Sequence, residues 1–268
     1  MHKYLILFLT ITLATLFYFN FVLAKPEDLK IIFFDVGQGD AILLTDSKNS
    51  QILIDGGPDD KVLEKLGQVM PFWDKTVEMI ILTHPDKDHL TGLNYVLENY
   101  QVKRIVFSQT VKETDNYQSF LDLAKTESGA EIILPEAKAI EVAPQFALEI
   151  VNPSEANENN LTDNDLSIVI RLTSPMQSVL LTGDLETKGE RYLIRQNVYI
   201  KADVLKVGHH GSKSSSSVNW LTAVSPKQAV ISVGRDNRYG HPHQEVLERL
   251  SNTEILRTDE KGNIEIDL

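Results

Sequence analysis

Thr83-His84-Pro85-Asp86-Lys87-Asp88-His89 is the segment from which the architecture of this chain is inferred. It contains two imidazoles and two carboxylates, which are side chains that bind zinc, manganese and iron. An apolar run at residues 77–82 predicts a buried strand before it, and helical spacing follows at residues 90–100. A polar surface turn is the alternative. Because open α/β sheets place their sites where strands end and helices begin, we predict a metal site here.

The spacing within this segment suggests two metal positions. His84 and Asp86 are two residues apart, so in extended backbone their side chains point the same way and can share one cation. Asp88 and His89 turn with the chain toward a second cation. The segment therefore supplies His84, Asp86, Asp88 and His89 as predicted metal ligands.

Two further predicted strands end in residues that bind metals. Residues 180–184 end in Asp184 after a small-residue turn, and one carboxylate can bridge two cations about 3.5–4 Å apart. An aspartate after a glycine is also frequent in ordinary turns. Residues 207–212 follow another strand, and there His209 is placed to complete the shell of the second metal.

Two polar segments are candidates for substrate contact. Ser212, Lys213 and Ser214 offer hydroxyls and a cation to an anionic substrate, although a solvated loop that caps the next helix explains the serines equally well. His241 and His243 lie in a turn before a helix. They suit substrate contact or general-acid chemistry, and surface histidines that cap a helix are the alternative.

Residues 1–24 form a separate segment. An uncharged, almost wholly apolar stretch at residues 4–24 is close to the length that spans a bilayer. Val22 and Ala24 fit a cleavage site after Ala24. A cleaved signal peptide and an uncleaved membrane anchor are both open, and a buried core helix is a weaker third reading. Either of the first two predicts export of a hydrolase domain at residues 29–268.

The net charge and the cysteine content limit which partners and which metal ligands this chain can have. The formal net charge is −12, so long-range electrostatics oppose nonspecific binding to nucleic acid. They do not exclude a phosphate ester held locally by metal ions. The chain has no cysteine, so a disulfide framework and thiolate ligands are excluded and any metal site uses nitrogen and oxygen.

Strands and helices alternate in two comparable halves, which predicts an α/β layered fold. Together the motifs resemble the metallo-β-lactamase superfamily, and within it the extracytoplasmic hydrolase domain of ComEC-type DNA-uptake proteins. The resemblance extends over residues 29–268 and implies a four-layered αβ/βα sandwich with two metals between the sheets. It rests on residues 34–40, 54–57, 84–89, 181–184, 209–212 and 233–243.

The resemblance also implies roles for individual residues. Asp55 would support the loop of His84, His84 and Asp86 would bind the first metal, and Asp184 would bridge the two metals. Asp88, His89 and His209 would bind the second metal. The sequence departs from the superfamily pattern at two places.

Asp86 replaces the histidine that is commonest in the superfamily. No histidine lies at residues 90–206, where another ligand is expected. Asn164 or Asp165 is the best substitute, with a polar loop as the alternative.

These oxygen ligands favour a harder cation, so we expect two divalent metal ions, Mn or Zn, with Mn slightly favoured. We expect an exported phosphodiesterase or nuclease that uses a metal-activated water on a phosphodiester such as DNA. The predicted catalytic residues are Asp88, His241 and His210, with a histidine protonating the leaving oxygen. A hydrolase of lactones or thioesters, and a metal-poor envelope binding protein, are the alternatives. Membrane contact is expected only if the N-terminal segment stays uncleaved, and one apolar segment encodes no channel.

Overall fold

The computed structural model describes residues 29–47, 50–108, 110–133, 139–143, 146–152 and 161–268. The predicted leader, residues 1–24, lies outside the described residues. Within the described part of the chain, no helix is both long enough and apolar enough to cross a membrane.

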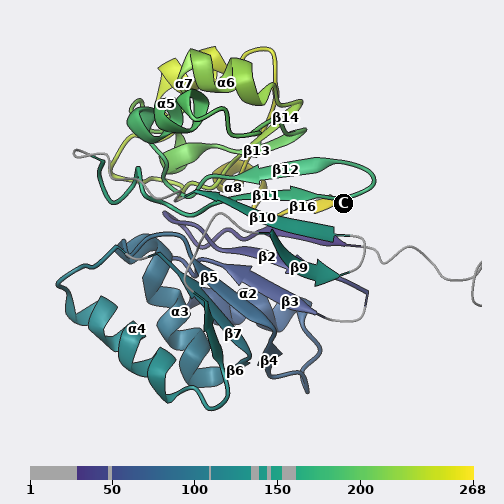
Figure 1. Cartoon of the computed structure of the whole chain (residues 1–268), viewed down its shortest axis with the longest axis vertical. Coiled ribbons are helices and arrows are strands. Elements are labelled where there is room, and N and C mark those ends of the chain that lie inside the picture. Colours follow the sequence, from purple (N-terminus) through teal and green to yellow (C-terminus); the bar gives the residue numbers. More distant parts are fainter. Residues whose placement is uncertain (1–28, 48–49, 109, 134–138, 144–145, 153–160) are drawn as a thin grey trace, which may run out of the picture.

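Two mixed β-sheets lie face to face in the middle of the molecule (Figure 1). The first sheet runs in the order β16 (Ile264–Asp267), β1 (Lys30–Phe33), β2 (Ile42–Thr45), β3 (Gln51–Ile54), β5 (Met79–Leu82), β7 (Arg104–Phe107) and β8 (Glu131–Ile133). The second runs β15 (Glu254–Arg257), β14 (Gln228–Ile231), β13 (Val204–Lys206), β12 (Ser178–Leu181), β11 (Val169–Thr173), β10 (Phe146–Asn152) and β9 (Ala139–Ala143). A small separate pair joins β4 (Thr76–Val77) to β6 (Gln101–Val102).

Helices cover the outer face of each sheet, as Figure 1 shows. The first sheet carries α2 (Lys61–Val69), α3 (Lys87–Asn99) and α4 (Asp115–Thr126). The second carries α5 (Thr187–Arg195), α6 (Val218–Val224) and α7 (Gln244–Arg249), and the chain also forms the short helices η1 (Gly208–Gly211) and α8 (Thr258–Lys261). The predicted αβ/βα sandwich is confirmed. The domain boundary at residue 29 stays a prediction.

Successive side chains along a strand pack into different layers of the core. In β1, Ile31 and Phe33 pack between the two sheets. Ile32 belongs to the cluster that packs the first sheet against its helices, and so does Phe34 just after the strand. Because both faces of such a strand are buried, its sequence is a continuous apolar run and not an alternation of apolar and polar residues.

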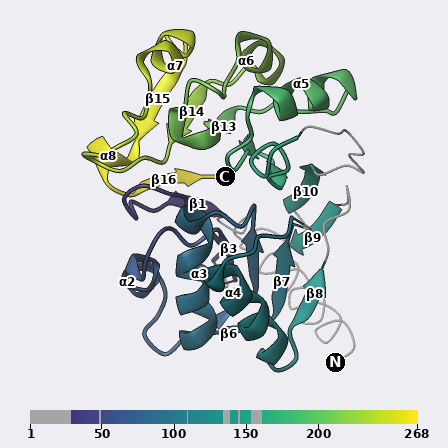
Figure 2. The ribbon, with the colours of Figure 1, turned by 90° about the vertical axis from the view of Figure 1, so that its left-hand side faces the viewer.

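The parallel strands place the functional loops at one end of the molecule. β5 pairs in parallel with β3, and β12 pairs in parallel with β13, so their carboxyl ends point the same way within each sheet. The backbone N–H of Ile168 donates to the carbonyl of Thr83 at 2.9 Å and joins the halves at that end. Figure 2 faces this end, with α3 below and α5 above.

Candidate metal centre

Asp55 braces the loop that follows β5. Its Oδ1 accepts the backbone N–H of Thr83 at 2.8 Å, and its Oδ2 accepts the Thr83 hydroxyl at 2.7 Å. The same Oδ2 lies 2.8 Å from Nδ1 of His89. Burial raises the pKa of Asp55, although the facing His89 opposes the rise. The carboxylate fixes the His89 ring with its other nitrogen turned into the site, as the supporting role predicted for Asp55 requires.

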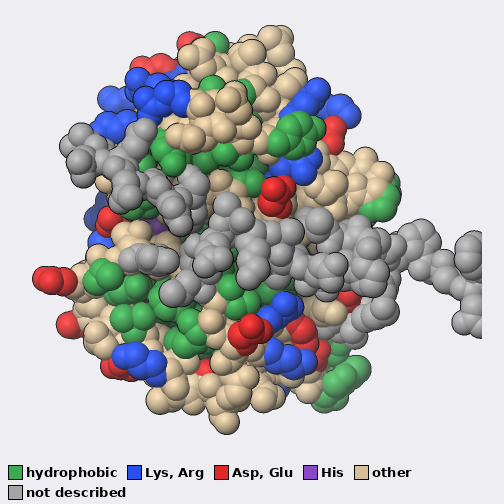
Figure 3. Space-filling view, in the orientation of Figure 1, with side chains coloured by type: hydrophobic (Ala, Val, Ile, Leu, Met, Phe, Trp, Pro, Cys, Tyr) green, Lys and Arg blue, Asp and Glu red, His purple; other side chains and the backbone are tan. Residues whose placement is uncertain are grey.

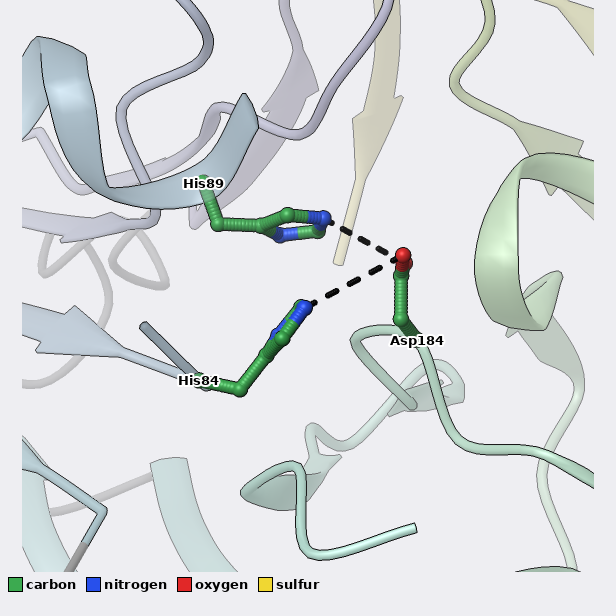
Figure 4. A group of neighbouring side chains, drawn as sticks. All are labelled: His84, His89 and Asp184. Carbon is green, nitrogen blue, oxygen red and sulfur yellow. Dashed lines mark ion pairs between the residues drawn. The ribbon is translucent and has the colours of Figure 1, made fainter. Parts of the chain in front are cut away.

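His84, His89 and Asp184 converge from three different elements (Figure 4). His84 follows β5, His89 sits in the first turn of α3, and Asp184 follows β12. Nε2 of His89 lies 3.3 Å from Asp184 Oδ1, and Nε2 of His84 lies 4.0 Å from Asp184 Oδ2. Burial, together with the charge on His89, lowers the pKa of His84 to about 3, so its imidazole is neutral and has a free lone pair.

A second group joins Asp88 and His89 to His210. Nε2 of His210 lies 3.4 Å from Asp88 Oδ2 and 3.4 Å from Asp184 Oδ2, and its Nδ1 lies 2.9 Å from the carbonyl of Ser232. Burial opposes protonation of His210, but the carboxylates of Asp184 and Asp88 outweigh burial and raise its pKa to about 10. With Nδ1 held by a backbone carbonyl, Nε2 is oriented as a metal ligand would be.

The structure differs here from the sequence-based assignment. His209 was expected beside Asp88 and His89, but His210 occupies that place, although both histidines approach Oδ2 of Asp184. Nδ1 of His209 is 2.9 Å from Glu186 Oε1, and its Nε2 is 3.7 Å from Asp184 Oδ2. Both histidines have left-handed backbone, with φ of 46° and 53°, so the chain does not alternate as a strand would. His210 is buried inside the group, and its predicted role as general acid stays a prediction.

The first metal position is more open than the second. Asp86 Oδ2 lies 4.0 Å from His84 Nε2, while its other oxygen pairs with the ammonium of Lys112. Nδ2 of Asn164 lies 3.4 Å from Nδ1 of His209. Asp165 instead accepts the backbone N–H groups of Gly189 and Thr162. Of the two substitutes for the missing histidine, Asn164 is the one that contacts a candidate ligand, at the His209 nitrogen that also pairs with Glu186.

Buried atoms without hydrogen bonds mark where a cation fits. Nε2 of His84, Nε2 of His89, Nε2 of His210 and Oδ1 of Asp184 are all buried and make no hydrogen bond. Polar atoms in this condition are rare in folded proteins, because desolvation without a partner costs about 1–3 kcal/mol each. Their convergence on the Asp184 carboxylate therefore fits divalent metal ions bound by imidazole and carboxylate.

Sequence reasoning missed two functional neighbours, Asp40 and Lys206. Lys206, the last residue of β13, is fully buried and pairs its ammonium with Asp40. The same ammonium donates to the carbonyl of Gly183 at 3.0 Å and lies 3.7 Å from Asp184 Oδ1. Burial works against the charge on Lys206, but Asp40 and Asp184 outweigh it and raise the lysine pKa. A lone lysine inside the apolar strand at residues 202–207 was the available signal.

A groove of about 1000 Å³ opens beside the centre. Its lining includes the candidate ligands Asp86 and Asp88, the three cations Lys87, Lys112 and Arg238, and the aromatic ring of Tyr239. The groove spans both halves, because α3 and α4 supply one wall and the loop before α7 supplies the other. The space-filling view shows histidine at the left-hand side, at the level where the halves meet (Figure 3).

Of the other residues predicted to contact substrate, only some lie near the candidate ligands. The His241 ring lies 5.7 Å from that of His209 and 4.9 Å from that of His243. Burial, with the charges of His210 and His209, lowers the pKa of His241 to about 4, so its imidazole is neutral near pH 7 and not the imidazolium that a general acid requires.

The serines bond locally. Ser214 donates its hydroxyl to Glu186 and shares a 2.9 Å hydrogen bond with the hydroxyl of Ser212. Lys213 is exposed, and its backbone N–H donates to Nδ1 of His243. Substrate binding by these residues stays a prediction.

Comparison with known protein families agrees with this fold and this site. The model of the metallo-beta-lactamase superfamily matches residues 34–235, and the chain belongs to that superfamily. Membership supports a metal-dependent hydrolase, and the His and Asp groups suit divalent metals.

Among named relatives, the chain is 34% identical over 250 residues to "ComE operon protein 3" of Bacillus subtilis (strain 168), covering 86% of this chain and 32% of the relative. It is 30% identical to "Competence protein ComA" of Neisseria gonorrhoeae, covering 95% of this chain and 35% of the relative. The chain thus spans about a third of the length of these relatives.

Solved structures agree on the fold. The metallo-beta-lactamase fold protein YhfI from Bacillus subtilis superposes with a TM-score of 0.60 at 13% identity, covering 90% of this chain and all of that one. A diphosphatase of the PhnP family superposes with a TM-score of 0.53 at 12% identity, covering 89% of this chain and 98% of that one. At such low identity these likenesses concern the fold alone.

Proposed function

We propose that this protein is an exported, metal-dependent phosphodiesterase that cleaves nucleic acid, with DNA as the leading candidate. The observation that carries the proposal is the convergence of unpaired imidazole nitrogens and the Asp184 carboxylate at the edge of a groove lined by cations. The name of one relative, "Competence protein ComA", refers to competence, which supports a role in DNA uptake at the cell envelope.

Two divalent ions, Mn or Zn with Mn slightly favoured, suit the charges of the site. His84, Asp86 and His209 would hold the first ion, with Asp184 shared between the two. Asp88, His89 and His210 would hold the second. Five carboxylates, those of Asp40, Asp55, Asp86, Asp88 and Asp184, lie at the site. Two ammonium groups accompany them, with Lys206 paired to Asp40 and Lys112 paired to Asp86.

That leaves three net negative charges with neutral histidines and ionised carboxylates, and bound divalent cations would offset this excess. When bound, such ions lower the pKa of water and stabilise charge on a phosphoryl group.

The groove supports an anionic substrate despite the acidic chain. Lys87 and Arg238 can pair with phosphate oxygens, whereas Lys112 is already paired with Asp86. Arg238 also lies over the Tyr239 ring at 5.1 Å. The exposed Tyr239 ring offers a face on which a base can stack. The net charge of −12 repels polyanions at long range, so binding by this groove depends on short-range contacts.

The second candidate retains the metals and changes the substrate to an acyl ester such as a lactone or thioester. The groove is lined by three cations and three aspartates, and its cations Lys87 and Arg238 favour phosphate over an uncharged acyl group, so this candidate ranks second. A metal-poor binding protein of the envelope is the third candidate, and the unpaired buried nitrogens count against it.

The test compares Asp184→Ala with Asp122→Ala in the full chain. Asp122 lies exposed on α4 far from the site, so it controls for the loss of one carboxylate. We expect wild type and Asp122→Ala to bind two equivalents of Mn and to cleave single-stranded DNA. Asp184→Ala should lose more than about 100-fold in rate, because even residues that only support a ligand alter activity about 10–100-fold.

Three outcomes would exclude the proposal in different ways. Full activity in Asp184→Ala would refute the assigned site. Cleavage of lactones or thioesters without cleavage of phosphodiesters would select the acyl hydrolase. Binding of no metal by wild type would select the binding protein.

A further inference from the structure

The end of the molecule opposite the metal centre also has a recognisable surface, which we call the remote end. The metal centre lies at the carboxyl ends of β5, β12 and β13, so the remote end is where these strands begin. The first residue of β1, Lys30, pairs there with Thr45 and Asp267. Gln177, just before β12, donates to the carbonyl of Asp267, so both sheets reach this end together.

Large apolar side chains project into solvent at the remote end. Phe72 and Trp73 are 86% and 73% exposed on the turn before β4, and their rings meet edge to face at 4.8 Å. Met176 is 77% exposed in the hairpin between β11 and β12, and Tyr199 is 64% exposed in the segment before β13. In Figure 3, hydrophobic side chains show along the right-hand edge of the molecule.

The turn that presents Phe72 and Trp73 is fixed by hydrogen bonds. The backbone N–H of Asp74 donates to the carbonyl of Pro71 at 2.9 Å, and the Asp74 carboxylate accepts the N–H of Thr76 at 3.1 Å. An aromatic pair held out on an ordered turn presents a large apolar area that nothing in the described chain covers.

The sequence indicates what covers it. The uncharged apolar stretch at residues 4–24 has the length of a membrane span and ends four residues before Leu29. Those four residues can extend by at most about 14 Å. Leu29 and Lys30 lie at the remote end, between the apolar residues of the first half and those of the second. With residues 4–24 uncleaved as an anchor, on which this inference rests, the bilayer that holds them lies next to this end.

We propose that the remote end is a membrane-docking surface that rests on the bilayer through Phe72, Trp73, Met176 and Tyr199. Tryptophan and tyrosine favour the boundary between headgroups and acyl chains, because their rings are apolar with one polar atom. The net charge of −12 gives the chain no general attraction to anionic lipid. The Arg171 guanidinium lies 4.6 Å over the Tyr199 ring, but the exposed side chains of Phe72, Trp73 and Met176 make the contact mainly apolar. The groove then faces away from the membrane. The proposal is independent of which substrate the groove takes.

The tryptophan content supplies a probe. The chain has two tryptophans, and Trp220 is buried against the second sheet, so Trp220→Phe leaves Trp73 as the sole emitter. The full chain is reconstituted into phosphatidylcholine vesicles with and without brominated acyl chains, which quench tryptophan on contact. We expect loss of most of the Trp73 emission in the brominated vesicles.

A matched control moves the reporter to the other end. Val218 is exposed at the start of α6, near the metal centre, so the triple variant Trp73→Phe, Trp220→Phe and Val218→Trp should keep its emission. Equal or weaker quenching at residue 73 than at residue 218 would overturn the proposal. Quenching of Trp73 confined to phosphatidylglycerol vesicles would overturn it too, because an apolar contact does not require lipid charge.

Folding of the variants does not limit the test. If Trp220→Phe disturbs the core, the wild-type chain and Trp73→Phe are measured instead. The difference between their emissions is then the Trp73 signal, since Trp220 is buried and out of reach of the lipid.

Discussion

His209 and His210 are adjacent, yet their side chains serve different parts of the centre. His210 is buried and anchored by the carbonyl of Ser232, whereas the His209 side chain is 26% exposed and pairs with Glu186. A ligand that is buried and oriented on its second nitrogen loses little entropy on binding a cation. We therefore assign the tighter interaction with metal to His210.

We predict that His210→Ala lowers the bound metal from two equivalents to about one, because the group formed with Asp88 and His89 loses a third donor. His209→Ala should weaken binding less, by about 10–100-fold in affinity, since His209 lies farther from Asp184. Metal analysis after dialysis and calorimetric titration measure both. Retention of two tightly bound ions by His210→Ala, with loss in His209→Ala, would reverse the assignment.

Lys206 permits a prediction about stability. Lys206→Met should lower the free energy of unfolding of the metal-free protein by about 3–5 kcal/mol, because Asp40 remains as a buried carboxylate without its cation. Lys227→Met is the control: its ammonium pairs with Asp203 at 2.8 Å, but on the surface, so about 0–1 kcal/mol is expected. Denaturant titrations of both variants make the comparison, and equal losses would contradict a special role for Lys206.

The sequence allowed prediction of residues whose chemistry follows directly from a strand end. His84, His89 and Asp184 belong to that group, and the structure brings them together. The sequence did not show whether His209 or His210 lies beside Asp88 and His89. That placement depends on two left-handed backbone conformations that no local sequence pattern indicates. Asp40 and Lys206 were missed because their roles come from a pairing between the two sheets.

At the scale of elements, α3 holds two candidate ligands in place by packing tightly on the loop after β3. A Cβ on Gly92 would lie 1.8 Å from the carbonyl oxygen of Gly56, and the N–H of Gly92 donates to the carbonyl of Gly57 at 3.0 Å. Such close approach requires glycine. The first turn of α3, with Asp88 and His89, is thereby fixed against the first sheet.

We predict that Gly92→Ala destabilises the protein by about 1–3 kcal/mol, because the methyl group forces α3 away from the loop. Metal affinity should fall as well, since Asp88 and His89 move with the helix. Gly67→Ala in α2 is the matched control: a Cβ there meets nothing within 4 Å, and alanine should stabilise the helix by about 0.5–1 kcal/mol. Thermal melts and metal titrations provide the readouts, and a neutral Gly92→Ala would contradict this view of α3.

Most elements were predictable, because strands buried on both faces give apolar runs that glycine or polar residues interrupt. The prediction placed the start of this helix at residue 90, but α3 begins at Lys87, so that His89 lies inside its first turn and not before it. The short helix η1 was missed, since its left-handed backbone lies outside any regular period. Helix ends depend on contacts with neighbouring loops, which the sequence alone does not reveal.

For the whole molecule, the centre lies between two halves that each contribute ligands. We predict that removing metal with a chelator lowers the melting temperature of the wild-type chain, because ions that bind only the folded state stabilise it. At a concentration one hundred times the dissociation constant the stabilisation is about 2.7 kcal/mol. Scanning calorimetry with Mn and with chelator measures the shift. Asp184→Ala should show almost none, and an equal shift in that variant would place the stabilising ion elsewhere.

The pairing of β1 with β16 affects the order in which the chain folds. The two strands join residues far apart, and near them the N–H of Asp35 donates to the side chain of Asn263, 228 residues further along. During synthesis β1 therefore keeps one open edge until nearly all of the sandwich has been made. Because contacts over such separations form slowly, the first sheet stays exposed to wrong partners for longer than the second, whose parallel strands are close in sequence.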